Sequence, residues 1–215
     1  MRTSRPHMLL VVTLALVVVA PQPGFAQLGK RTAQDWLARL ETADRIAGMK
    51  ISETIPRLDL KPGDHVADIG AGTGLYSIPL AKAVPSGRVF AVDIDQDLLD
   101  IIQDKAKKEN VSNVEVVLGD FDDPKLSSRQ VDVAFFNDVL HHIEHRELYL
   151  KNLARYLKPN ARIVVIDLLR GHQNEPEMQI KLDQVKQWML GVGFQMTAEV
   201  TDLYTDKFFA VFARK

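Results

Sequence analysis

The chain has 215 residues, of which 46% are hydrophobic, and its formal net charge is −1. This length supports one substantial core and leaves little room for a second full domain. The near-neutral charge disfavours nucleic acids and anionic membrane surfaces as partners, and the absence of cysteine excludes disulfides, thiolate catalysis and Cys-ligated zinc.

The N-terminal segment has the three-part pattern of a secretory signal peptide. Arg2 and Arg5 precede an apolar run from residue 8 to residue 20, and Gly24-Phe25-Ala26 supplies small residues before a cleavage point. We expect residues 1–26 to be a signal peptide cut after Ala26, with export to the periplasm or beyond. The run is shorter than the roughly 20 residues of a spanning helix, so no stable membrane span should remain. An uncleaved anchor is the alternative, and without a genuine signal the chain would be cytoplasmic.

Residues 27–58 are predicted to form two short helices that precede the core. Apolar residues recur at helical spacing from Trp36 to Ala47, and Ile51, Ile55 and Leu58 continue the pattern beyond Gly48. These helices would cover one edge of the core. Their alternative role is that of a lid over a ligand.

From residue 59 onward, predicted strands alternate with predicted helices, which indicates a parallel sheet covered on both faces. After the alternation, a helix from Met178 to Leu190 leads into two strands that are close enough in sequence to be antiparallel. The predicted strands are His65–Ile69, Arg88–Val92, Val114–Leu118, Val131–Phe136, Arg162–Asp167, Phe194–Thr201 and Lys207–Ala213, and the helices between the first five are Tyr76–Ala83, Asp97–Lys107 and Arg146–Leu157.

A loop with glycine at every second position follows the first predicted strand. The strand ends in Asp68, and Gly70, Gly72 and Gly74 then allow positive φ and close approach of the backbone to a ligand at a helix N-terminus. A plain turn needs only one or two glycines. The loop therefore predicts a binding site for a polar ligand. Because the loop offers backbone N–H groups, an anionic ligand is favoured.

Polar residues also follow the next three strands, where ligands of open α/β sheets bind. Asp93 follows the second strand and could accept hydrogen bonds from both hydroxyls of a ribose. Asp120-Phe121 follows the third strand and suits an adenine amino group and its ring face. The segment Asn137–His142 follows the fourth strand and is the most polar cluster of the core region.

Together these four motifs, in this order, resemble those of class I S-adenosylmethionine-dependent methyltransferases over about residues 50–215. The resemblance implies a doubly wound, mostly parallel seven-stranded Rossmann-like sheet with helices on both faces and an antiparallel C-terminal strand. The methyltransferase domain would span residues 59–215. The turn Leu157–Arg162 is also similar to the family's turn into its fifth strand, although Asn160 stands where glycine is common; asparagine tolerates left-handed backbone.

The resemblance implies S-adenosyl-L-methionine as cofactor and a role for each motif. The glycine loop would face the methionine portion, Asp93 with Ile94 the ribose, Asp120 with Phe121 the adenine, and Asn137 the sulfonium; the expected cofactor-binding residues are Asp68, Gly70, Ala71, Gly72, Gly74, Asp93, Ile94, Asp120, Phe121 and Asn137. A nicotinamide cofactor is disfavoured, because its G-x-G-x-x-G fingerprint requires glycine where this chain has Leu75.

His141 and His142 are the candidate catalytic residues, since an imidazole could take a proton from a hydroxyl or amine. Alternatively, one caps the next helix and the other packs against the cofactor. Asp138 with both histidines would suggest a metal, but no clear further ligand is present, so no metal is expected. Asp167 should face the pocket in a structural or substrate-positioning role.

The expected function is methyl transfer to a small molecule by in-line displacement. The chain leaves space around the pocket only for the N-terminal helices and the Arg170–Glu177 loop, and it has no basic domain for nucleic acid. The alternative is an exported module that binds S-adenosylmethionine or a nucleoside without transferring a methyl group, because the cofactor is made in the cytoplasm.

Overall fold

The computed structural model describes residues 32–126, 130–169 and 180–215. The predicted signal peptide and the Arg170–Glu177 loop lie outside these residues. Their sheet has seven strands in the order β3-β2-β1-β4-β5-β7-β6, with parallel pairing from β3 to β5 and antiparallel pairing of β7 with both neighbours. The strands are β1 (His65–Ile69), β2 (Arg88–Asp93), β3 (Val114–Leu118), β4 (Val131–Asn137), β5 (Leu157–Leu168), β6 (Phe194–Glu199) and β7 (Lys207–Arg214). The predicted doubly wound α/β fold is confirmed.

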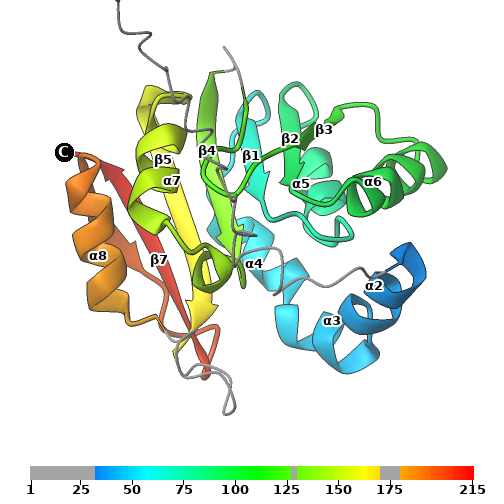
Figure 1. The fold of residues 1–215 in the computed structure, drawn as a ribbon, viewed down its shortest axis with the longest axis horizontal. Helices are drawn as coiled ribbons and strands as arrows, with labels where there is room; N and C mark the ends of the chain where they lie inside the picture. The colour runs from blue at the N-terminus through cyan, green and yellow to red at the C-terminus, as the bar shows by residue number, and fades with distance from the viewer. Residues whose placement is uncertain (1–31, 127–129, 170–179) are drawn as a thin grey trace, which may run out of the picture.

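Helices cover both faces of the sheet (Figure 1). Alternate strand residues point to opposite faces, so Val89 packs with the helices of one side and Phe90 with those of the other. One layer contains α4 (Ile51–Arg57), α5 (Ser77–Ala83) and α6 (Gln96–Lys108), and the other contains α7 (Arg146–Ala154) and α8 (Leu182–Gly191). The central strands are consequently buried on both sides, as parallel strands usually are.

Residues 32–58, the described part of the predicted covering segment, form three helices instead of the predicted two: α2 (Ala33–Leu40), α3 (Ala43–Met49) and α4. The long helical pattern is divided because the Thr42 side chain accepts a hydrogen bond from the Arg45 N–H and so starts a new helix. Lys50, with φ of 45°, then turns the chain between α3 and α4. Gly48, which was expected to end the helical pattern, lies inside α3.

The C-terminal half differs from prediction mainly at element ends. β5 begins at Leu157 instead of Arg162, and an irregularity between Val131 and Val133 of β4 accommodates the extra residues. Asn160 therefore lies within a strand, and it is absent from the positive-φ residues, so it does not use the left-handed conformation. The predicted helix start at Met178 lies outside the described residues; α8 begins at Leu182.

From β1, the chain adds β2 and β3 on one side of the sheet and then returns to add β4 and β5 on the other side of β1. The carboxyl ends of β1, β2 and β4 therefore meet at a switch point, where α/β folds bind ligands. In Figure 1, α2 and α3 lie beyond this edge of the sheet. Within the described ranges, no helix is long and apolar enough to cross a membrane.

Candidate active site

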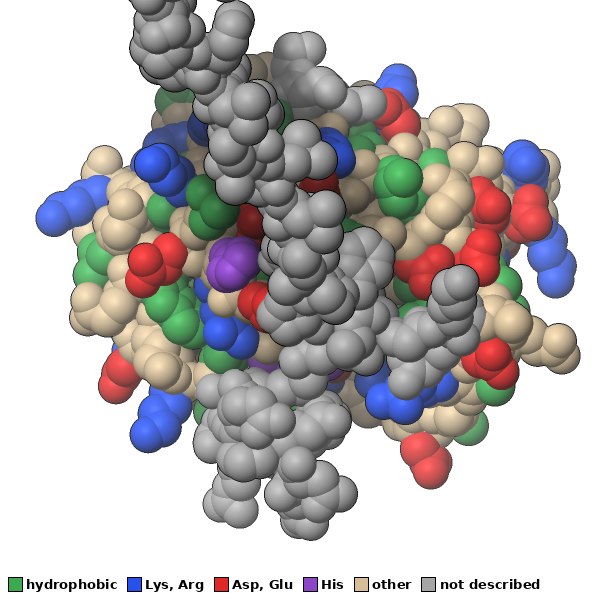
Figure 2. All heavy atoms as spheres, viewed as in Figure 1, with side chains coloured by type: hydrophobic (Ala, Val, Ile, Leu, Met, Phe, Trp, Pro, Cys, Tyr) green, Lys and Arg blue, Asp and Glu red, His purple; other side chains and the backbone are tan. Residues whose placement is uncertain are grey.

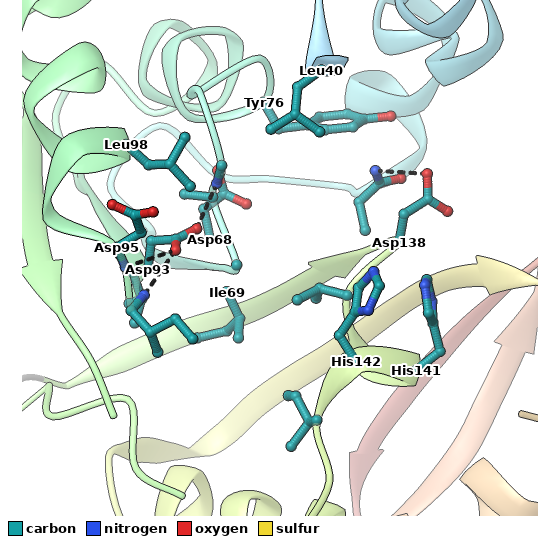
Figure 3. A pocket seen from close by; sticks show the side chains of 18 of the residues that line it. Leu40, Asp68, Ile69, Tyr76, Asp93, Asp95, Leu98, Asp138, His141 and His142 are labelled. Carbon is teal, nitrogen blue, oxygen red and sulfur yellow. Dashed lines mark hydrogen bonds between the residues drawn. The ribbon is translucent and has the colours of Figure 1, made fainter. Parts of the chain in front are cut away.

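A cavity of about 1410 Å³ opens at the carboxyl ends of the parallel strands. This volume exceeds the 300–1,000 Å³ typical of a site for one small ligand, so it has room for a cofactor and a second molecule. In Figure 3, Asp93, Asp95 and Leu98 lie on one wall, and Asp138, His141 and His142 lie on the opposite wall. Eleven of the twelve residues predicted for the site line the cavity, and Gly74 does not.

The three loop glycines all have positive φ, but they differ in their surroundings. A Cβ on Gly70 would lie 2.2 Å from a methyl carbon of Val139, and one on Gly74 would lie 2.9 Å from Ile102. A Cβ on Gly72 would meet only Leu40, at 3.5 Å. Gly70 and Gly74 thus serve packing, whereas Gly72 leaves backbone accessible to a ligand.

Asp68 and Asp93 are neighbouring carboxyl groups with raised pKa values. Burial raises the pKa of Asp68 to about 7, against the effect of a 2.6 Å hydrogen bond from the Ser77 hydroxyl. Burial likewise raises the pKa of Asp93 to about 6, although its carboxylate accepts N–H bonds from Gly72 at 2.8 Å and Ile94 at 2.8 Å. Asp93 therefore holds the glycine loop against the end of β2.

Asp120 and Phe121 lie on the cavity wall after β3, as predicted. Phe121 is 38% exposed, and its N–H donates to the Asp120 carboxylate at 2.8 Å. Asp120 forms a 3.0 Å ion pair with Lys125, which, with that N–H, lowers its pKa. The exposed ring offers an apolar surface beside an ionised acid.

His141 and His142 form a short 3-10 helix, η1 (Leu140–His142), directly after β4. His141 is buried, and its Nδ1 lies 2.6 Å from the Asp167 carboxylate. That carboxylate also accepts the backbone N–H groups of His141 and Leu168. A carboxylate partner at Nδ1 favours the tautomer of the neutral imidazole in which Nδ1 is protonated and Nε2 carries the lone pair. The ring of the exposed His142 lies 4.0 Å from that of His141, centre to centre.

Asp167 does not line the cavity as expected; it is fully buried behind His141. The sequence placed it correctly at the end of β5 but could not show that its imidazole neighbour lies between it and the cavity. Arg146 holds the same turn from α7, donating to the carbonyls of Leu140 at 3.1 Å and His141 at 2.7 Å. The position of the imidazole is consequently fixed from both sides. At the start of α7, where one of the two histidines was the alternative candidate for a helix cap, the N-cap residue is His145, which makes no side-chain cap hydrogen bond.

Asn137 ends β4, Asp138 directly follows it, and both line the cavity. Among the described residues, Asn137 Oδ1 and Asp138 Oδ1 are buried without a hydrogen-bond partner. Asp138 has φ of 52° and pairs through Oδ2 with Lys207 of β7 at 2.6 Å. Sequence reasoning missed this pair, because Lys207 looks like an ordinary strand residue.

The helices α2 and α3 close one side of the cavity. Trp36 of α2 donates from Nε1 to the Asp95 carboxylate at 2.9 Å. Glu41, which ends α2, pairs with Lys105 of α6, and Lys105 also donates to the Thr73 carbonyl of the glycine loop at 2.9 Å. These bonds join α2 to the segment after β2 and, through Lys105, to the glycine loop.

A second anchor joins α3 to distant parts of the chain. The Met49 carbonyl accepts hydrogen bonds from the hydroxyls of Tyr76 and Tyr204, both at 2.7 Å. Thr54 Oγ1 lies 2.7 Å from the Tyr204 hydroxyl. Tyr76 also lines the cavity and packs edge-to-face on Phe135. A strand-and-motif pattern contains no signal for such contacts.

The described parts of the chain contain no cluster of three or more His, Asp or Glu side chains that could hold a metal ion. On the face drawn in Figure 2, acidic and basic side chains are interspersed among the described residues.

Comparison with known proteins agrees with the geometry. Residues 66–160 match the family model described as a methyltransferase domain. The chain is 36% identical over 131 residues to an uncharacterized 37.1 kDa protein in a transposon from Streptomyces fradiae, covering 60% of this chain and 37% of that protein. It is 32% identical over 111 residues to a demethylmenaquinone methyltransferase of Staphylococcus carnosus, covering 51% of this chain and 45% of that enzyme. The chain thus spans less than half the length of these relatives.

A solved structure of a SAM-dependent methyltransferase from Aquifex aeolicus has the same fold. It superposes with a TM-score of 0.76 at 23% identity, covering 86% of this chain and all of the other. The family match, the order of motifs around the cavity and this shared fold lead to one assignment. Residues 66–160 of the chain are a methyltransferase domain, and the chain has the fold of S-adenosylmethionine-dependent methyltransferases.

Proposed function

We propose that this chain transfers a methyl group from S-adenosylmethionine to a small-molecule acceptor. The observation that carries the proposal is one cavity lined by the glycine loop, Asp93 and Asp120-Phe121 and also by Asn137 and the two histidines. Figure 3 shows Asp93 on the wall opposite the histidines. This arrangement provides a cofactor side and an acceptor side within one cavity.

The residues fit this cofactor. Gly72 leaves its backbone open where a Cβ would reach only Leu40, and Asp93 has acceptor capacity beyond its N–H bonds for the ribose hydroxyls. Asn137 Oδ1, buried without a partner among the described residues, would border the positive sulfonium. The remaining assignments follow the predicted roles: the loop for methionine, Asp120 and Phe121 for adenine.

When bound, S-adenosylmethionine supplies a methyl group on a positively charged sulfur, which an acceptor atom takes by in-line displacement. The protein then has to orient the acceptor and receive its proton. We assign that proton to Nε2 of His141, because Asp167 holds Nδ1 at 2.6 Å and stabilises the imidazolium that forms. His142, exposed beside it, is the second candidate.

The test combines binding and turnover. Isothermal titration should show S-adenosylmethionine binding, and an assay over phenols, alcohols, amines and thiols should show methyl transfer. His141→Gln and Asp167→Asn should lower kcat by about 10²–10⁴ while the cofactor Kd stays within about twofold, because neither is assigned to cofactor binding. His65→Gln is the matched control, since His65 lies at the opposite end of β1 and does not line the cavity.

Two results would contradict the proposal. Tight cofactor binding without turnover on any acceptor would favour a binding module, and the absence of binding would exclude both functions. Unchanged kcat in both His141→Gln and Asp167→Asn would remove His141 as the base.

We further propose that residues 1–26 are a signal peptide, that residues 27–58 cover the core, and that the methyltransferase domain spans 59–215. The support for export is the order of basic, apolar and small residues before Gln27. N-terminal sequencing of the chain from its producing cell should start at Gln27. A chain that keeps Met1 and is recovered without membranes would contradict export.

A further inference from the structure

The ion pair of Asp138 and Lys207 lies on the acceptor wall of the cavity and has no role in the chemistry described so far. Their side chains are 10% and 8% exposed, and Lys207 Nζ lies 2.6 Å from Asp138 Oδ2. Both residues line the cavity. Asp138 directly follows Asn137, and Figure 3 shows it on the wall opposite Asp93, next to the histidines. The pair is therefore placed beside the acceptor and away from the ribose-binding side.

The hydrogen-bonding capacity of the pair is only partly used. A lysine ammonium has three donors; that of Lys207 donates to Asp138, lies 5.5 Å from the centre of the Tyr204 ring, and has no further acceptor within the described ranges. Asp138 Oδ1 is buried and accepts no hydrogen bond from these residues. One wall thus presents open donors beside an open acceptor, and buried polar groups of this kind normally have partners.

Stability alone is a poor explanation for this pair. Replacing a buried ion pair by apolar residues is often neutral or stabilising, because desolvation offsets the attraction between the charges. Asp138 additionally adopts a left-handed conformation, which is uncommon for a non-glycine residue. Strain and buried charge together at a cavity wall are typical of a functional position.

The open groups define a complementary ligand. A lone carboxylate would satisfy Lys207 but would be repelled by Asp138, and an amine would do the reverse. Two adjacent oxygens on one ring satisfy both groups: one accepts from the Lys207 ammonium, and its neighbouring hydroxyl donates to Asp138 Oδ1. Tyr76, which is 3% exposed, adds an aromatic side chain to the lining of the same cavity near Asp138 (Figure 3).

We propose that Asp138 and Lys207 are the acceptor-recognition residues and that the acceptor is a flat molecule with two vicinal oxygen functions, of the catechol type. The inference rests on the proposed function, since it specifies the acceptor of that same site. It assigns recognition to the pair and leaves proton transfer to His141.

The test uses 4-nitrocatechol and 4-nitrophenol, whose ionisation is visible by absorbance, with the full chain saturated with S-adenosylhomocysteine. The wild-type protein should bind 4-nitrocatechol at least about tenfold more tightly than 4-nitrophenol, which corresponds to the gain from one additional good hydrogen bond to a charged group. Binding should also shift the ionisation of the probe to lower pH, because the Lys207 ammonium favours its anion.

The variants separate the two contacts. Asp138→Asn should reduce the affinity for 4-nitrocatechol to that for 4-nitrophenol, and asparagine tolerates the left-handed backbone. Lys207→Met should remove the ionisation shift for both probes. The double variant Asp138→Asn/Lys207→Met, which leaves no unpaired buried charge, provides a folded protein for the same measurement if Lys207→Met is unstable.

Lys50→Met is the matched control. Lys50 lies 5.8 Å from the centre of the same Tyr204 ring and donates to the Leu203 carbonyl at 2.6 Å, but it does not line the cavity. This variant should keep both probe affinities and the ionisation shift.

Equal affinity of the wild type for both probes, or an unchanged ionisation shift in the double variant, would overturn the inference. Weak or absent probe binding to a protein that binds S-adenosylhomocysteine would do the same while leaving the proposed function intact. Failure to bind S-adenosylhomocysteine at all would instead reject the proposed function, and the inference with it.

Discussion

Gly72 differs from the other two glycines of its loop in what surrounds it. Side chains of other residues occupy the space where a Cβ of Gly70 or Gly74 would lie. Packing within the fold therefore explains why these two positions are glycine. Gly72 has the same left-handed backbone but an open side, and its N–H is held by Asp93 at 2.8 Å. Its glycine keeps the backbone accessible on the cofactor side of the cavity.

The Gly72→Val variant is therefore expected to lose S-adenosylmethionine binding while remaining folded. The left-handed conformation should cost about 1–2 kcal/mol, which lowers Tm by a few degrees in a chain of this size. Isothermal titration and thermal unfolding measure the two effects separately. Gly63→Ala, where the added Cβ has nothing within 4 Å, should keep full affinity. Cofactor binding by Gly72→Val would show that the loop does not face the ligand.

Among the elements, the strands were the most predictable, and the reason lies in their residues. Apolar runs such as Val89–Val92 mark the strands, and the polar residues Asp93 and Asn137 mark strand ends. The covering helices were less predictable, because the break at Thr42 is a capping contact that leaves the apolar spacing almost unchanged. The lengthened β5 depends on pairing with β4, which a single segment does not encode.

The covering helices should control how fast the cofactor leaves. Trp36→Phe keeps an aromatic ring in place but removes the Nε1 hydrogen bond to Asp95, worth about 1 kcal/mol. We expect release of radiolabelled S-adenosylhomocysteine to become about fivefold faster, with little change in Tm. Trp188→Phe on α8, which does not line the cavity, should leave release unchanged. Equal release rates in both variants would mean that α2 does not act as a lid.

At the scale of the whole molecule, buried acids near the cavity make stability depend on pH. The ordinary pKa of Asp68 is 3.8 and its folded value is about 7, so between these values the folded state binds more protons than the unfolded state. The resulting stabilisation is present below pH 3.8 and is lost as pH rises through 7. Asp93, with a folded pKa of about 6, contributes in the same direction.

Asp68→Asn should therefore be more stable than the wild type at pH 8, without cofactor. A three-unit shift corresponds to ~4 kcal/mol, and loss of the charged hydrogen bond from Ser77 offsets part of it, so we expect about 2 kcal/mol. The advantage should shrink toward pH 5, where the wild-type carboxyl is protonated. Thermal unfolding from pH 5 to pH 8 measures it. A difference in stability between Asp68→Asn and the wild type that is the same at pH 5 and at pH 8 would show that Asp68 does not titrate in this range.

The sequence predicted which residues line the site better than it predicted the contacts between their side chains. Strand order and the residues after each strand brought the glycine loop, Asp93 and the histidines to one cavity. The pairing of Asp138 with Lys207, and the position of Asp167 behind His141, could not be read in this way. These contacts join side chains from distant strands, and neither spacing nor composition specifies which side chains face each other.

The Met49 carbonyl, bonded by Tyr76 and Tyr204, has a consequence for protein engineering. Residues 49 and 204 are 155 positions apart, yet this hydrogen bond connects the covering helices to the segment before β7. Transplanting these helices alone onto another methyltransferase would leave their main carbonyl anchor without its partner. A working graft should carry the Tyr204 segment with them, and the smallest exchangeable unit of this chain is therefore discontinuous in sequence.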